Sequence, residues 1–104
     1  DNDFVISGDK FKELNKAELI LVDVREPEEF VNGHLDQAFN SPLGRFLFKS
    51  KSESSDEYKL LHDGKKVVVY CSSGGRAKIA TNAMRSRGFD HTFAVSEGYS
   101  EIKE

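Results

Sequence analysis

Two nearly continuous aliphatic runs constrain the fold of this chain more than any other feature of its sequence. The first is ELILVDV at residues 18–24, and the second is KKVVVYC at residues 65–71. Runs of this kind, rich in β-branched residues and lacking a regular polar alternation, are typical of strands buried on both faces of a parallel sheet. They predict an α/β fold in which helices cover the sheet.

The remaining segments alternate between further strand and helix candidates. The strand candidates are residues 4–6, 38–40 and 91–95. One helix candidate follows the capping residue Ser7. The others cover residues 26–31, residues 76–88 and a last turn at residues 98–104. Strands that alternate with helices are typical of parallel sheets with right-handed crossovers. We therefore expect a central parallel β-sheet flanked by helices on both faces, within a single domain over residues 1–104.

The helix predicted over residues 76–88 carries small side chains that would let it lie close to the sheet. The residues expected on or beside its inner face are Ala77, Ala80, Ala83, Ile79 and Met84, and Gly88 is expected to end it.

Residues 44–64 are the least determined part of the chain. Ser54 and Glu57 fit a capping box in front of a helix that would end near Gly64. The polar residues before it are expected to form a solvated loop, and the sequence indicates no role for residues 45–55.

Composition excludes several classes of function. The 104 residues carry a formal net charge of -3, so there is no basic surface of the kind that binds nucleic acid. The longest apolar runs are far too short to span a bilayer, so no membrane partner is expected. The three histidines are scattered without the spacing of metal ligands, and neither a metal site nor a cofactor is predicted.

The chain has one cysteine, Cys71, which excludes an internal disulfide. A lone thiol is compatible with a reducing cytoplasm. The chain begins at Asp1 and shows no signal peptide, so a mature periplasmic form stays open as the alternative.

Cys71 begins the segment CSSGGR, residues 71–76, which joins a predicted strand to a predicted helix. Gly74 and Gly75 allow backbone angles that other residues resist, so a tight loop can turn successive N–H groups inward. The N-terminus of the following helix and the charge of Arg76 add attraction for an anion. We expect these groups to favour the thiolate of Cys71, which would then act as a nucleophile without a histidine base.

In these segments the chain resembles the rhodanese-like domains, and in particular the single-domain sulfurtransferases. The matching segments follow the family's order and are LILVDVREPEEF, NGHLDQAFNSPL, KKVVVYCSSGGRA and RSRGFDHTFAVSEG. They cover most of the chain from residue 18 onward. The chain departs from the family near its end, where Glu97 replaces the first of two frequent glycines and Ile102 replaces a frequent tryptophan.

The resemblance implies that Cys71 accepts a sulfane sulfur, becomes a persulfide and passes the sulfur to a thiophilic acceptor. The expected donors are thiosulfate and persulfides, and the expected acceptors are thiols, cyanide or a protein. The resemblance also implies that residues 71–76 form the active-site loop. The residues expected to bind substrate are then Ser72, Ser73, Gly74, Gly75 and Arg76.

Asp23 and Arg25 follow the strand at residues 18–24, whose carboxyl end should lie beside that of the strand preceding Cys71. They would either shape the rim of the site or form an ion pair that ties the strand end to the loop. The second of these interpretations is favoured, because a charged pair at a strand end more often positions other groups than reacts.

The length of the loop separates sulfur transfer from a related chemistry. Phosphatases related to this family have a loop one residue longer, with arginine six positions after the cysteine, whereas Arg76 follows Cys71 by five positions. The shorter loop suits one sulfur atom better than a tetrahedral oxyanion, which disfavours a phosphatase or an arsenate reductase. A non-catalytic protein-interaction module is the other alternative, and the intact cysteine in a glycine-rich loop disfavours it.

Overall fold

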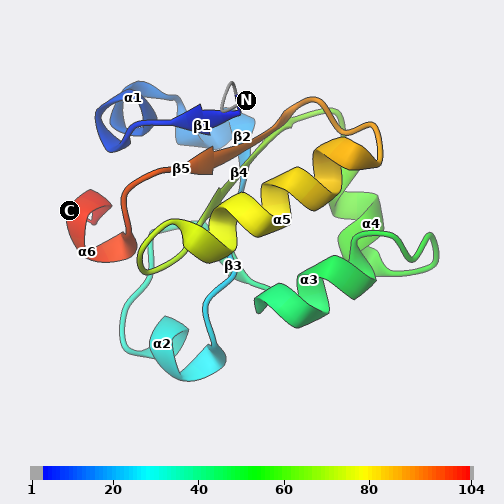
Figure 1. Cartoon of the computed structure of the whole chain (residues 1–104), viewed down its shortest axis with the longest axis horizontal. Coiled ribbons are helices and arrows are strands. Elements are labelled where there is room, and N and C mark those ends of the chain that lie inside the picture. Colours follow the sequence, from blue (N-terminus) through cyan, green and yellow to red (C-terminus); the bar gives the residue numbers. More distant parts are fainter. Residues whose placement is uncertain (1–3, 104) are drawn as a thin grey trace.

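The computed structural model describes residues 4–103, which form a five-stranded sheet flanked by helices (Figure 1). The strand order is β1 (Val5–Ile6), β5 (Thr92–Val95), β4 (Lys66–Tyr70), β2 (Leu19–Asp23) and β3 (Phe39–Asn40). All four neighbouring pairs are parallel. The predicted parallel α/β sheet is therefore confirmed, and the two aliphatic runs supply its adjacent inner strands, β4 and β2.

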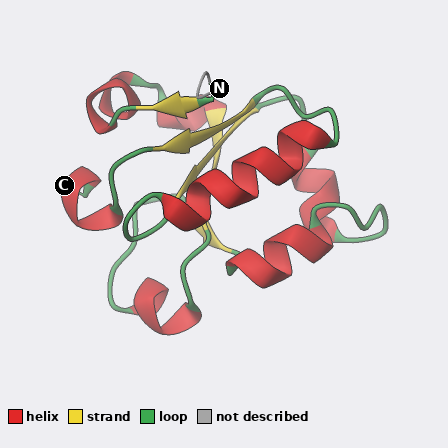
Figure 2. Ribbon diagram, in the orientation of Figure 1, coloured by secondary structure: helices red, strands yellow, loops and turns green. Residues whose placement is uncertain are grey.

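Within residues 4–103, six α-helices and one 3-10 turn accompany the strands, and the last helix follows the final strand (Figure 2). The helices are α1 (Gly8–Glu13), α2 (Pro27–Val31), α3 (Leu43–Lys49), α4 (Asp56–Leu61), α5 (Gly75–Ser86) and α6 (Tyr99–Ile102), and the 3-10 turn is Lys16–Glu18. The long helix α5 crosses in front of the sheet in Figure 1, and α1 and α6 lie together at one side of the picture. Helices thus cover both faces, as expected.

Alternating residues of β2 and β4 feed two separate cores, one on each face of the sheet. Val22, Val67 and Val69 pack with residues of α3, α4 and α5. Leu21 and Val68 pack on the opposite face with residues of α1 and α6. Because both faces of these strands are buried, each run needs apolar side chains at nearly every position, which explains their lack of alternation.

Helix α5 presents a slightly different face to the sheet from the one predicted. Its buried residues are Ala77, Ala80, Thr81 and Met84. These positions follow the 3.6-residue period of a helix, so Thr81 occupies the stripe and Ala83 lies at its edge. Ile79 falls on the outer side and is 53% exposed, so its expected place beside the inner face is wrong.

The segment over residues 44–64 contains one helix that the sequence did not predict. Helix α3 begins directly after Pro42 and buries Phe46 completely. The predicted cap of α4 is off by one residue, because Ser55 rather than Ser54 accepts the N–H of Tyr58 at 3.0 Å. Glu57 is not free for a capping box, since its carboxylate accepts the Ser41 hydroxyl at 2.7 Å and Arg45 at 2.6 Å.

No helix within residues 4–103 has both the length and the apolar character needed to cross a bilayer.

Candidate active site

The carboxyl ends of β4 and β2 lie side by side and bring together the residues that the sequence singled out. Tyr70, the last residue of β4, is in register with Asp23, the last residue of β2. The carbonyl of Tyr70 accepts the N–H of Val24 at 3.1 Å, which holds the two strand ends together. Cys71 follows β4 directly and Arg25 lies two residues after the end of β2, so they share the edge of the sheet where parallel α/β folds place their ligands.

Cys71 lies at the bottom of the loop and its side chain is fully buried. Its Sγ accepts two backbone hydrogen bonds, from the N–H of Gly74 at 3.0 Å and from the N–H of Ala77 at 3.4 Å. The second donor belongs to the first turn of α5, where N–H groups have no partner within the helix. Both donors and the helix dipole favour negative charge on this sulfur.

Only one of the two loop glycines has a backbone that demands glycine. Gly74 adopts φ +95°, in the left-handed region, and a Cβ there would collide with the carbonyl oxygen of Ser96. Gly75 is exposed, is not among the positive-φ residues, and has no atom near the position that a Cβ would occupy. The expectation that both glycines supply unusual backbone angles is therefore corrected for Gly75.

The segment after β5 contacts the backbone of the loop, a contact that the sequence does not predict. The N–H of Tyr99 donates to the carbonyl of Cys71 at 2.9 Å. Gly98 lies so close to the carbonyl oxygen of Ser72 that a Cβ at Gly98 would overlap it. Gly98 is the glycine that the chain retains of the two that are frequent in the family, and this close contact explains why a larger residue does not fit there.

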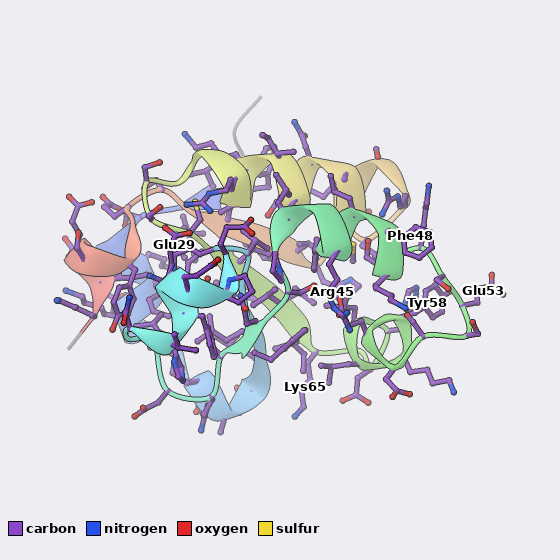
Figure 3. All side chains as sticks on the ribbon, turned by 90° about the horizontal axis from the view of Figure 1, so that it is seen from below. Glu29, Arg45, Phe48, Glu53, Tyr58 and Lys65 are labelled. Atoms are coloured by element: carbon purple, nitrogen blue, oxygen red, sulfur yellow. The ribbon has the colours of Figure 1, made fainter. Side chains whose placement is uncertain are left out.

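Arg76 is held by a carboxylate that the sequence analysis did not place at the site. Its Nη1 lies 2.9 Å from Oε1 of Glu29 on α2, and its Nη2 lies 3.3 Å from Oε2 of the same residue. Nη2 also donates to the Ser72 hydroxyl. In Figure 3 Glu29 extends from α2 toward the start of α5. The guanidinium is therefore engaged at the loop's rim rather than left open for an anion.

The pairing changes the acidity of Glu29. The hydrogen bonds from Arg76, followed by the backbone N–H of Glu26, lower the pKa of Glu29 to about 2. The carboxylate in turn raises the pKa of Arg76. Both groups are charged at neutral pH, and together they carry no net charge.

The two loop serines have different surroundings. Ser72 is exposed and its hydroxyl lies between Arg76 and Glu29, donating to Oε2 of Glu29 at 3.4 Å. Ser73 is exposed, and its side chain makes no hydrogen bond with the described part of the chain. Both serines follow Cys71 directly in the loop, and within residues 4–103 the recorded donors to its sulfur are the N–H groups of Gly74 and Ala77.

Asp23 and Arg25 form a buried ion pair. Nε and Nη2 of Arg25 lie 2.8–3.0 Å from the Asp23 carboxylate, and the two side chains are 6% and 0% exposed. Burial alone would lower the pKa of Arg25, but the hydrogen bonds and charge of Asp23 raise it. Nη2 also donates to the carbonyl of Gly33 at 2.7 Å, and the guanidinium stacks 4.4 Å from the ring centre of Tyr99. The pair therefore ties β2 to the turn at Gly33 and to α6, and it neighbours the loop through the rings of Tyr99 and Tyr70.

No group of three or more histidine, cysteine, aspartate or glutamate side chains within residues 4–103 is arranged to hold a metal ion.

Comparisons with known proteins agree with this architecture. The family model of the rhodanese-like domain matches residues 7–104, nearly the whole chain. The chain therefore belongs to the rhodanese-like domain family.

Solved structures of several organisms share the fold. The human single-domain sulfurtransferase TSTD1 is 24% identical with a TM-score of 0.77, and the match covers 94% of this chain and 93% of that one. A rhodanese-related protein of Thermoplasma volcanium is 26% identical with a TM-score of 0.73, covering 94% and 88%. A protein of unknown function and possible tyrosine phosphatase from Rhodopseudomonas palustris is 21% identical with a TM-score of 0.82, covering 94% and 77%. The fold is shared by proteins with different names, so the activity has to be argued from the site.

Proposed function

We propose that this chain is a sulfurtransferase that carries sulfane sulfur as a persulfide on Cys71. The observation that carries the proposal is the pair of backbone N–H groups of Gly74 and Ala77 directed at one buried sulfur atom. Such donors stabilise a thiolate before transfer and a persulfide anion after it. Membership of the rhodanese-like family and the fold shared with the human sulfurtransferase support the same chemistry.

In the first half-reaction the thiolate of Cys71 attacks the outer sulfur of a donor. With thiosulfate, a new S–S bond forms at Cys71 while the S–S bond of the donor breaks, and sulfite leaves with the electron pair. With an organic persulfide, the leaving group is the thiolate of the organic part. Neither route needs an oxidant, because one S–S bond forms as another breaks and the transferred sulfur keeps its oxidation state.

In the second half-reaction an acceptor thiolate or cyanide attacks the outer sulfur of the Cys71 persulfide. The S–S bond at Cys71 breaks, and its thiolate is restored with the bonding electron pair. The N–H groups that hold the sulfur then again face a thiolate, so the cradle serves the resting and the loaded state. A covalent intermediate between two half-reactions predicts ping-pong kinetics.

Oxyanion chemistry is the second candidate, because one structural neighbour is named as a possible tyrosine phosphatase. Two features weigh against it. Arg76 is only five positions from Cys71, and its guanidinium is bound to Glu29 rather than turned toward the sulfur. A phosphoryl group would need donors around three oxygens, whereas the N–H groups of Gly74 and Ala77 both point at a single sulfur atom.

Steady-state kinetics test the proposal. Sulfur transfer from thiosulfate or an organic persulfide to cyanide should give parallel double-reciprocal lines, and Cys71→Ser should abolish turnover while the far-ultraviolet spectrum stays native. Hydrolysis of p-nitrophenyl phosphate in the absence of sulfur transfer would instead favour the phosphatase. A folded wild-type protein with neither activity would favour the non-catalytic module.

A further inference from the structure

We infer that Glu29 is a specificity-determining residue that directs the site away from dianionic donors such as thiosulfate and toward sulfane donors of lower charge, of which organic persulfides are the simplest class. The inference deepens the proposed sulfur transfer and rests on it. It starts from an unexpected pairing. The guanidinium of Arg76, the cation at the active-site loop, already forms an ion pair with the carboxylate of Glu29.

The geometry makes this pairing specific. Both guanidinium Nη atoms of Arg76 face both carboxylate oxygens of Glu29, at 2.9 and 3.3 Å, and Ser72 bridges the two side chains. Two-point contacts of this kind are the stronger form of the arginine–carboxylate interaction. The side chains are only 30% and 36% exposed, so the pair lies partly inside the rim of the loop.

The charges around the pair do not restore a positive site. The charge of Glu26, one turn before Glu29 on the chain, adds to that of Glu29 in raising the pKa of Arg76. Arg25, the other arginine at this edge of the sheet, forms an ion pair with the buried Asp23. Within residues 4–103 no further lysine or arginine side chain hydrogen-bonds to residues 71–76. The charged side chains that hydrogen-bond to the loop, Arg76 and Glu29, therefore sum to zero.

Sulfane donors differ in the negative charge that they bring to this loop. Thiosulfate carries two negative charges next to the sulfur that is attacked, and the sulfite that leaves also carries two. An alkyl persulfide carries at most one, and its neutral form transfers a sulfur to the Cys71 thiolate with release of an alkyl thiolate. A neutralised Arg76 thus penalises the first class far more than the second.

The test measures sulfur loading alone, with no acceptor present. The protein is mixed with thiosulfate or with 2-hydroxyethyl persulfide, quenched at intervals with acid, and the loaded fraction is read from the intact mass. Glu29→Gln keeps the shape of the side chain and releases Arg76. It should raise the second-order rate constant for thiosulfate by roughly 5- to 30-fold, the effect of one unit of charge on a dianion in a partly solvated site. The constant for the persulfide should change by less than about twofold, since its attacked form carries little or no charge.

Glu28→Gln is the matched control, because it removes the same charge from the neighbouring position of α2. Glu28 is exposed and no hydrogen bond joins it to Arg76. It should leave the ratio of the two rate constants near that of the wild type. In an Arg76→Gln background the unpaired Glu29 carboxylate repels thiosulfate directly, so Glu29→Gln should still speed thiosulfate loading there, but the double variant should load thiosulfate more slowly than Glu29→Gln alone because it lacks the guanidinium.

A measurement on the wild-type protein adds a readout that needs no variant. Thiosulfate loading should not slow as ionic strength rises, whereas in Glu29→Gln it should slow, because salt screens the attraction between a dianion and a free guanidinium. An equal change for both donors in Glu29→Gln, an equal gain in Glu28→Gln, or wild-type loading that slows with salt would overturn the inference. Failure of the wild type to load Cys71 from either donor would instead contradict the proposed function.

Discussion

The backbone N–H of Tyr99 donates a 2.9 Å hydrogen bond to the carbonyl oxygen of Cys71, so the C-terminal segment is bonded to the backbone of the proposed nucleophile. The residue before it, Gly98, lies against the carbonyl oxygen of Ser72. The two family departures in this segment leave that arrangement in place. Glu97 accepts the N–H of Gly8 at 2.6 Å and links the segment to α1, while Ile102, the last residue of α6, is buried in the core that it shares with Phe11 of α1.

Gly98→Ala should displace the active-site loop where Gly98 contacts it, at Ser72. The added Cβ has no room beside the Ser72 carbonyl, so the backbone of either the loop or the C-terminal segment has to move. We expect a loss of roughly 1–3 kcal/mol in unfolding free energy, as for other overpacked sites. We also expect a large fall in sulfur transfer, because displacement of Ser72 misplaces the N–H groups around Cys71. Chemical denaturation and the loading rate measure the two effects.

Gly44→Ala is the control for that substitution. Gly44 lies in α3 with no atom within 4 Å of the position of a Cβ, and its φ is ordinary. Gly44 is the second residue of α3, so alanine there should raise the unfolding free energy only slightly, by at most about 1 kcal/mol, because alanine is the better helix former. A Gly98→Ala protein as stable and active as the Gly44→Ala protein would show that the loop is not packed against Gly98.

The buried Asp23–Arg25 pair should be costly to break from one side. Asp23→Asn keeps the size of the side chain but leaves the Arg25 guanidinium charged at 6% exposure. We expect a loss of about 3–5 kcal/mol, the usual effect of leaving a buried charge without its partner. Arg45→Gln is the comparison, because Arg45 is 58% exposed and its partner Glu57, 11% exposed, keeps the Ser41 hydroxyl as a donor, so it should cost less than Asp23→Asn. Urea unfolding compares the two, and equal losses would contradict the structural role given to Asp23.

Glu29 should titrate far below an ordinary glutamate. Its folded pKa of about 2 lies below the ordinary value of 4.5, so the pairing with Arg76 stabilises the folded state above pH 4.5 and loses that contribution as the pH falls through 2. Carbon-detected NMR of the carboxyl group measures the midpoint directly. In Arg76→Gln the midpoint should move back toward 4.5, and a midpoint near 4.5 in the wild type would refute the ion pair.

The sequence predicts the sheet well because the signal is local and strong. Val67, Val68 and Val69 can only be accommodated together where both faces are covered, and that requirement identifies the central strands without any knowledge of their neighbours. The position of Cys71 at a strand end and the helix after it are local in the same way. The α/β class and the rhodanese-like family were predicted correctly on these segments.

The parts that escaped prediction depend on contacts between distant segments. Glu29 lies 47 positions from Arg76, and its acidic neighbours suggest only a favourable helix N-terminus. Glu57 fits a capping box with Ser54 by spacing, but the Ser41 hydroxyl and Arg45 claim its carboxylate in the fold. Gly98 acquires its meaning only when the loop at Ser72 is brought against it. A pattern confined to one segment cannot report such partners.

The intact mass of the protein after exposure to a sulfane donor tests the central claim most directly. After incubation with 2-hydroxyethyl persulfide and removal of the excess, the account predicts a gain of one sulfur atom per chain. The added sulfur should map to the peptide that contains Cys71, be released as thiocyanate by cyanide, and be absent in Cys71→Ser. An unchanged mass in a folded wild-type protein, or a gain that persists in Cys71→Ser, would contradict it.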